Sequence, residues 1–515
     1  MGYSEDIAEE SAVSPEPDET AADEGNQEEE RPSSGCKSHR AVTTVIPGLD
    51  VIIPQSNKGD QQGSGIEEQK SDFVQKVFTL DKSVVKKMRQ NLAQNDMMLD
   101  SMCIYFYDTT AFRNQLKMRS DSYMWMVGLM GLFYTLPVFQ MALFYQEHSL
   151  DSGHLDICRF NFECLHPFAG IQDFGHVFSN ISYITCGVVF LCIVVNRRNR
   201  RLMLSSKRSA RDPIMHPEQC GIPEQYGIFY AMGTSLIMEG ILSICYHICP
   251  NAMSLQFDTT FMYTIGVLVF LKVYQFRHPD ITHTAHVVFL VFGLVLCMEV
   301  VGYFTNHIAF WTIFFITHIV IAVILLVYIH TNGSMLHGMS VHQIRATLRN
   351  SCVGTLVNWR SRVKQTVYKM SAAAINLGLG IYFYGTQKLG VSKHLLIIIM
   401  ANMLMYVCYY ILRKLHSRFN KGIPAEGIKC ATVCYGILSL VASGFGGYFL
   451  QGERRSITAT AAASKNLNGA CLLGIYDNHD MWHFSTSLTA LSFFMLLLTL
   501  EEGNDNVPRN RIPVF

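Results

Sequence analysis

Long apolar stretches recur along most of this chain, and they constrain its fold more than any other feature. Between residues 123 and 500, runs of about 20 mainly apolar residues alternate with shorter polar segments. Because a bilayer core offers no water to backbone polar groups, such a stretch crosses it as an α-helix. The sequence predicts an all-α polytopic membrane protein with about ten transmembrane helices, at 123–145, 173–195, 226–246, 257–275, 283–304, 308–329, 367–385, 394–413, 428–450 and 479–500.

Basic residues between the spans predict which side of the membrane each loop faces, because cytosolic loops carry an excess of Lys and Arg. The loop after the second span, the segment 330–366 and the loop after the eighth span are all rich in them. Alternate counting from these loops places both ends of the chain in the cytosol. Arg454 and Arg455 then fall on the outer side, but the bias of the other loops outweighs them.

The residues before the first span have a different composition. From Glu5 to Glu30 every charged residue is acidic and few residues are apolar, so 1–70 is predicted to be a disordered acidic cytosolic tail. Residues 71–122 read as a basic juxtamembrane segment on the cytosolic surface, or as an ordinary solvated helix. The transmembrane helical domain then covers 123–515. Over the whole chain, 41 basic residues balance 41 acidic ones, which excludes a globally basic nucleic-acid-binding protein.

Four of the fifteen cysteines fall in or beside the predicted outer loops, where disulfides can form. They are Cys158, Cys164, Cys249 and Cys471. Four cysteines allow three pairings, and the spacing does not choose among them.

Polar residues at the outer ends of three spans form the candidate site. His479 and His483 stand four residues apart, so their imidazoles share one helical face. His247 ends the third span at the same predicted level, and three imidazoles suit a catalytic Zn²⁺ site. Asp258, at the start of the fourth span, is the candidate general base or ligand-orienting carboxylate, and Ser243 the candidate donor to metal-bound water or an oxyanion.

Further polar residues are candidates to support this site. Glu239 lies eight residues before His247, about 12 Å deeper along the helix. Asp173, His176 and Ser179 precede or begin the second span and could line the same cavity. An alternative interpretation is that each histidine is only an interfacial residue, since a pair at this spacing also arises by chance among 19 histidines. The combination of all three helices distinguishes the metal site from that alternative.

Several stretches resemble the systemic RNA interference defective (SID) transmembrane family over about 123–515. They include 156–167 (DICRFNFECLHP), 178–183 (FSNISY), 243–251 (SICYHICPN), 257–263 (FDTTFMY) and 479–483 (HDMWH). That family contains cholesterol uptake proteins and transporters of double-stranded RNA, and it looks related to membrane hydrolases such as the alkaline ceramidases and adiponectin receptors. The resemblance implies Zn²⁺ on His247, His479 and His483, with Ser243 and Asp258 beside it.

The resemblance also raises an expectation about the start of the chain. Family members usually carry a large β-rich extracellular domain and one span before the loop that residues 1–122 resemble. We therefore expect a truncated or shortened member, in which RNA engagement is weakened more than lipid binding.

Two segments match a loose sterol-contact pattern, in which a tyrosine lies between an aliphatic and a basic residue. The first segment contains Tyr274 and Arg277, and the second contains Tyr409 and Arg413. These four residues are the candidate sterol contacts.

The predicted function is transport of double-stranded RNA, cholesterol uptake, or both, in a multi-pass protein of the plasma membrane or the lysosomal or endosomal membrane. The alternative function is a zinc-dependent lipid hydrolase that cleaves an ester or amide bond. A third possibility is a purely structural zinc that joins the third and tenth spans. The expected partners are membrane lipids and cholesterol, double-stranded RNA and a second copy of the chain in a homodimer.

Overall fold

The computed structural model describes most of the chain beyond residue 109. The described residues are 110–154, 157–211, 221–222, 225–251, 253–278, 284–305, 307–330, 359–386, 390–419, 427–452, 463, 465–467, 469, 471–472, 474–505, 507 and 512. The predicted acidic tail (1–70) and the part of the predicted juxtamembrane segment up to residue 109 lie outside them. From Thr110 onward, the end of that segment continues without a break into the first long helix.

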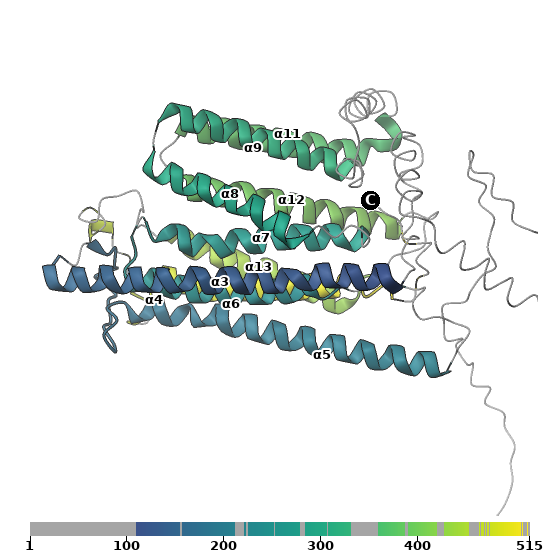
Figure 1. Ribbon diagram of the computed structural model, residues 1–515, viewed down its shortest axis with the longest axis horizontal. Helices are drawn as coiled ribbons and strands as arrows, with labels where there is room; N and C mark the ends of the chain where they lie inside the picture. The colour runs from purple at the N-terminus through teal and green to yellow at the C-terminus, as the bar shows by residue number, and fades with distance from the viewer. Residues whose placement is uncertain are drawn as a thin grey trace, which may run out of the picture.

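The described part of the chain is a bundle of long helices that run side by side (Figure 1). The helices are α3 (Thr110–Ser152), α4 (Phe174–Ser179), α5 (Ile181–Arg211), α6 (Gly227–Ile248), α7 (Leu255–Arg277), α8 (Ala285–Phe304), α9 (Ile308–His330), α11 (Trp359–Thr386), α12 (Val391–Phe419), α13 (Cys430–Gly452) and α15 (Asn478–Thr499), with a 3₁₀ turn, η5, at Lys465–Leu467. Only isolated β-bridges accompany them among the described residues. The predicted all-α fold is confirmed.

Nine helical segments within the described residues are long and apolar enough to cross a membrane. They correspond to nine of the ten predicted spans. The tenth range, 367–385, falls within α11, which packs beside α9 in the same bundle. Trp125, Phe133 and Leu440 are examples of large apolar side chains that are more than two-thirds exposed on helix surfaces. Apolar surface of this extent suits contact with lipid, so the chain is a multi-pass membrane protein.

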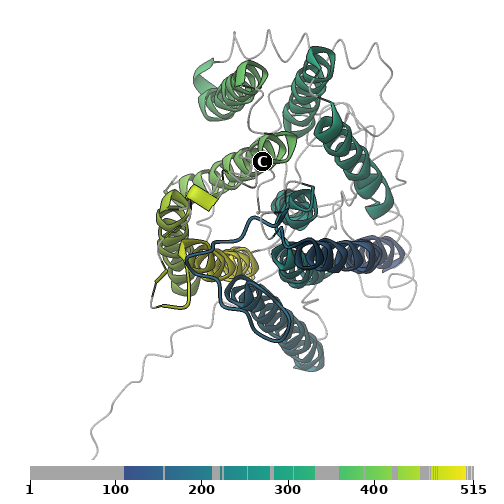
Figure 2. The ribbon, with the colours of Figure 1, turned by 90° about the vertical axis from the view of Figure 1, so that its left-hand side faces the viewer.

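Helix α7 lies near the middle of the bundle when it is viewed along the helices (Figure 2). Side chains of α7 share one continuous core with aromatic side chains of α5, α6 and α15, in which the rings of Phe190 and Phe494 are 5.1 Å apart. Gly240 of α6 allows a close approach to α5, since a Cβ there would lie 3.0 Å from the carbonyl oxygen of Asn180. This contact sets α6 directly against the residues that join α4 to α5.

Helix α15 begins at Asn478 because Asp477 caps it. The Asp477 carboxylate accepts the backbone N–H groups of His479 and Asp480, and the Asp480 carboxylate accepts that of Asp477. This reciprocal capping box satisfies backbone donors that the first helical turn leaves without partners. The cap therefore fixes the first turns of α15, where two of the candidate histidines lie.

The opposite end of α15 is held by a buried ion-pair cluster around Glu501. Its carboxylate pairs with Arg277 at 3.3 Å and Lys414 at 2.9 Å, and Tyr410 donates a hydrogen bond to it at 2.6 Å. Burial alone would raise the pKa of Glu501, but the two cations hold that pKa below its ordinary value. The resulting stabilisation is present above the unfolded-state pKa of about 4.3 and is lost only as pH falls through the lower folded value.

We expect Glu501→Gln to destabilise the bundle by about 3–5 kcal/mol, because it leaves the buried cations Arg277 and Lys414 without their counter-ion. Thermal unfolding of the purified protein in detergent at neutral pH measures the effect. The matched control is Asp505→Asn, which breaks a partly exposed pair with Arg201 and should cost less than about 1 kcal/mol. Equal effects of the two substitutions would contradict the role of the Glu501 cluster.

Candidate metal centre

The three predicted ligand histidines come together at one end of the bundle. His247 lies in the last turn of α6, and His479 and His483 lie in the first two turns of α15. Their ring centroids are 5.0, 5.0 and 4.5 Å apart, and one ligand atom from each lies within 4.8 Å of the others. His247 and His483 are buried. A tetrahedral Zn²⁺ would hold such nitrogens at about 2.0–2.1 Å from the metal, so the trio fits this ion after a small contraction.

Ser179 sets the orientation of the His483 ring. Its hydroxyl lies 2.8 Å from Nδ1 of His483 and donates its own hydrogen to the carbonyl oxygen of His176 at 3.0 Å. The Nδ2 amide of Asn180 lies 3.2 Å from the same ring nitrogen. Because these neighbours surround Nδ1, Nε2 is the nitrogen that would take a metal, as in metal sites whose ligands are oriented by neighbouring hydrogen-bond partners. Ser179 therefore lies beside the histidine trio, in contact with one of its rings.

Ser243 lies one turn before His247 in α6, and Asp258 lies in the first turn of α7. The Ser243 hydroxyl is in hydrogen-bonding contact with the Asp258 carboxylate. Asp258 is 7% exposed, and its Oδ1 has no hydrogen-bond partner in the structure. Deeper in α6, both carboxylate oxygens of the buried Glu239 also lack a hydrogen-bond partner. Buried polar atoms of this kind are costly unless something binds them, so these oxygens are suited to bind a polar ligand.

His176 lies closer to the trio than its sequence position indicated. Its ring stacks on that of His247 at 5.0 Å and lies 5.2 Å from that of His479. Nδ1 of His176 is 2.5 Å from Asp173, the third supporting candidate. The sequence interpretation missed Asp477 and Asp480, which meet this histidine. Their spacing ahead of an apolar run is that of a capping box and could have identified them.

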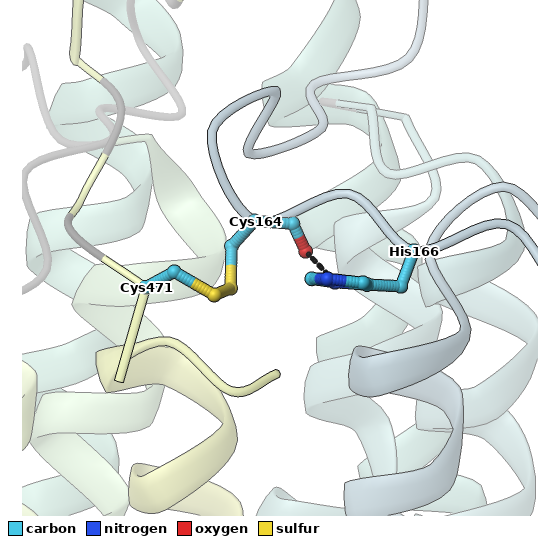
Figure 3. A group of neighbouring side chains, drawn as sticks. All are labelled: Cys164, His166 and Cys471. Carbon is cyan, nitrogen blue, oxygen red and sulfur yellow. Dashed lines mark hydrogen bonds between the residues drawn. A yellow bond between two sulfur atoms is a disulfide. The ribbon is translucent and has the colours of Figure 1, made fainter. Parts of the chain in front are cut away.

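The structure selects one of the three possible cysteine pairings. Cys158 is bonded to Cys249, and Cys164 is bonded to Cys471. Figure 3 shows the second disulfide beside His166, whose Nδ1 is 3.0 Å from the carbonyl oxygen of Cys164. Because Cys164 and Cys471 are joined in a disulfide, neither of them offers a thiolate to a metal beside His166. Both disulfides lie at the end of the bundle that carries the histidines.

The candidate sterol contacts lie at the other end of the bundle, and most of them are buried. Tyr274 and Arg277 are 3% and 1% exposed, and the Arg277 guanidinium belongs to the Glu501 cluster. Tyr409 is buried against Tyr368, with ring centroids 4.3 Å apart, and Arg413 is half-buried. The pattern in these segments therefore reflects internal packing of α7 and α12 rather than a surface open to lipid.

Together, the fold and this site define a polytopic helical membrane protein with a largely buried three-histidine cluster at one end of the helix bundle. The chain belongs to the dsRNA-gated channel SID-1 family, whose model matches residues 33–515. The resemblance seen in the sequence is thus confirmed.

Known proteins with similar sequences come from mammals and a nematode. SID1 transmembrane family member 1 of Rattus norvegicus is 35% identical over 404 residues, which are 76% of this chain and 47% of the relative. The Homo sapiens protein of the same name is 34% identical over 417 residues, 76% of this chain and 46% of the relative. Cholesterol uptake protein 1 of Caenorhabditis elegans is 32% identical over 414 residues, 78% and 52% respectively. The chain spans about half the length of these curated relatives.

Peptide mapping under non-reducing conditions tests the observed pairing. We expect one cross-linked peptide to contain Cys158 and Cys249 and another to contain Cys164 and Cys471, because these pairs are bonded in the structure. Reduction should release both. Recovery of Cys158 joined to Cys164, with Cys249 joined to Cys471, would contradict the arrangement of the loops around the histidines.

Proposed function

We propose that His247, His479 and His483 bind one Zn²⁺ and that this chain acts in the membrane transport of double-stranded RNA, cholesterol, or both. The convergence of three imidazoles from two helices that are distant in the sequence carries the metal proposal. The substrates are proposed from the description of the family and from the name of the nematode relative. The proposed location is the plasma membrane or the lysosomal or endosomal membrane, where the disulfide end would face the oxidising or lumenal side.

The zinc proposal gives the histidine cluster a structural role in transport. Binding to His247 on one side and to His479 and His483 on the other would tie the end of α6 to the start of α15. Both helices contribute to the main core, so this tie would fix their relative positions through the bundle. Membrane lipids, cholesterol and a second copy of the chain are the remaining proposed partners.

A zinc-dependent lipid hydrolase is the second candidate function, and the unpartnered Oδ1 of Asp258 favours it. When bound in such a site, zinc lowers the pKa of a coordinated water toward about 7. Asp258 would accept the proton of the attacking water, and Ser243 would orient the reacting oxygen by a hydrogen bond. The substrate would be a lipid ester or amide that reaches the cavity from the membrane.

The zinc proposal predicts that His483→Ala removes the metal bound by the trio. We expect elemental analysis of the purified protein to show one Zn²⁺ per chain fewer than in the wild type. His286→Ala is the control, because His286 is exposed on α8, away from the cluster, and should change nothing. Ser179→Ala should weaken zinc binding by about 10–100-fold, the usual effect of removing a group that orients a ligand. Unchanged zinc content in His483→Ala would refute the assignment.

Asp258→Asn separates the transport and hydrolase functions. If the chain is a hydrolase, this variant keeps its zinc but no longer releases product from a labelled ceramide or phospholipid in vesicles. If the metal is only structural, cells that express the variant take up labelled double-stranded RNA and labelled cholesterol as well as cells that express the wild-type protein. RNA uptake should fall steeply with added salt, since backbone phosphates dominate the contacts. If cells that express the wild-type protein take up neither cargo, the transport proposal is ruled out.

A further inference from the structure

We propose that His176, Asp477 and Asp480 form a second site, distinct from the histidine trio, that binds a divalent transition-metal ion. One ligand atom from each of these three residues lies within 4.8 Å of the others. All three side chains are at most 2% exposed. They come from α4 and from the start of α15, and none of them belongs to the trio.

The surroundings of His176 orient its ring as a metal ligand requires. Asp173 takes Nδ1 at 2.5 Å, and Nε2 faces Asp477 with 3.3 Å between Nε2 and Oδ1. A carboxylate on one ring nitrogen with the other nitrogen directed into a cluster of ligands is the arrangement common to metal-bound histidines.

The two aspartates of α15 are also fixed in place. Asp477 Oδ2 accepts a hydrogen bond from Asn161 at 2.9 Å, and Asp480 Oδ2 accepts the backbone N–H of Asp477 at 2.9 Å. The other oxygen of Asp480, Oδ1, has no hydrogen-bond partner although the residue is 2% exposed. A buried carboxylate oxygen in this state is costly, and a cation bound to it would remove that cost.

The charges of the group favour a divalent ion. Asp173, Asp477 and Asp480 carry three formal negative charges around a single imidazole, which can supply at most one positive charge. Two carboxylates and one imidazole form a mixed oxygen and nitrogen donor set, of the kind that binds Zn²⁺ or Mn²⁺. A thiolate-preferring ion such as Cu(I) would find no suitable donor among these three residues.

The two sites would be neighbours that share no ligand. The His176 ring stacks on His247 at 5.0 Å, and Asp480 lies between the trio ligands His479 and His483 in the sequence. The N-terminal end of α15, with its N-cap, would therefore present its histidines to one ion and its aspartates to the other. This inference does not depend on the trio, because each site has its own three residues.

The decisive measurement is the number of Zn²⁺ ions bound per chain after chelation and reloading of the full-length purified protein, measured by elemental analysis. We expect two ions in the wild type, and one in each of His176→Phe, Asp480→Asn and His483→Ala. His176→Phe keeps an aromatic ring against His247 while it removes the ligand nitrogens. The combined His176→Phe and His483→Ala variant should bind none. His318→Asn changes a buried histidine elsewhere in the bundle and should retain both ions. In the wild type, added Mn²⁺ should compete with Zn²⁺ for the site that His176→Phe removes.

The outcomes distinguish this site from the zinc trio. One ion in the wild type that persists in His176→Phe would overturn the second site and make His176 an ion-pair partner of the carboxylates. One ion that both His176→Phe and His483→Ala abolish would also overturn it, because the metal would then belong to a single shared site. One ion that only His176→Phe abolishes would support the second site and refute the trio. Asp480→Asn removes a ligand that lies on a different helix from His176, so it tests the second site if His176→Phe fails to fold.

Discussion

The whole arrangement depends on how α15 is held at its two ends. At one end the Asp477 cap and the Cys164–Cys471 disulfide fix its first turn, and at the other Glu501 pairs with Arg277 and Lys414. The helix between them is 22 residues long, or about 33 Å. Sliding of this helix along its axis would break the buried ion pairs of Glu501 with Arg277 and Lys414. The positions of His479 and His483 relative to α6 follow from that constraint.

Burial in a low-dielectric interior gives the histidine end of the bundle its chemical character. Carboxylates, imidazoles and hydroxyls from α4, α6, α7 and α15 are gathered there within an otherwise apolar bundle. Polar groups in such an environment interact strongly and are costly when they have no partner. The oxygens of Asp258, Glu239 and Asp480 that lack hydrogen bonds are therefore informative. They indicate where a metal ion, a water molecule or the polar group of a lipid would be stabilised.

Other intramembrane polar residues hold the remaining helices together. Glu299 of α8 and His318 of α9 belong to two separate hydrogen-bonded groups. Glu299 accepts a hydrogen bond from Tyr263, whereas His318 contacts Asn376, which in turn bonds to Asn402. Each group connects different helices at a depth where a hydrogen bond has no competition from water. These hydrogen bonds join α7 to α8 and α9 to α11 and α12.

The sequence by itself determined the helical class, the ranges of the spans and the residue types of the trio, because hydropathy and i, i+4 spacing are local properties of the chain. Tertiary structure alone decided the cysteine pairing, the meeting of His176 with Asp477 and Asp480, and the burial of Tyr274 and Arg277. These depend on which faces of distant helices pack together, and a helix face carries no record of its partner. A pattern such as the sterol motif reads the same on a lipid-facing surface and in a buried core, so only packing could distinguish them.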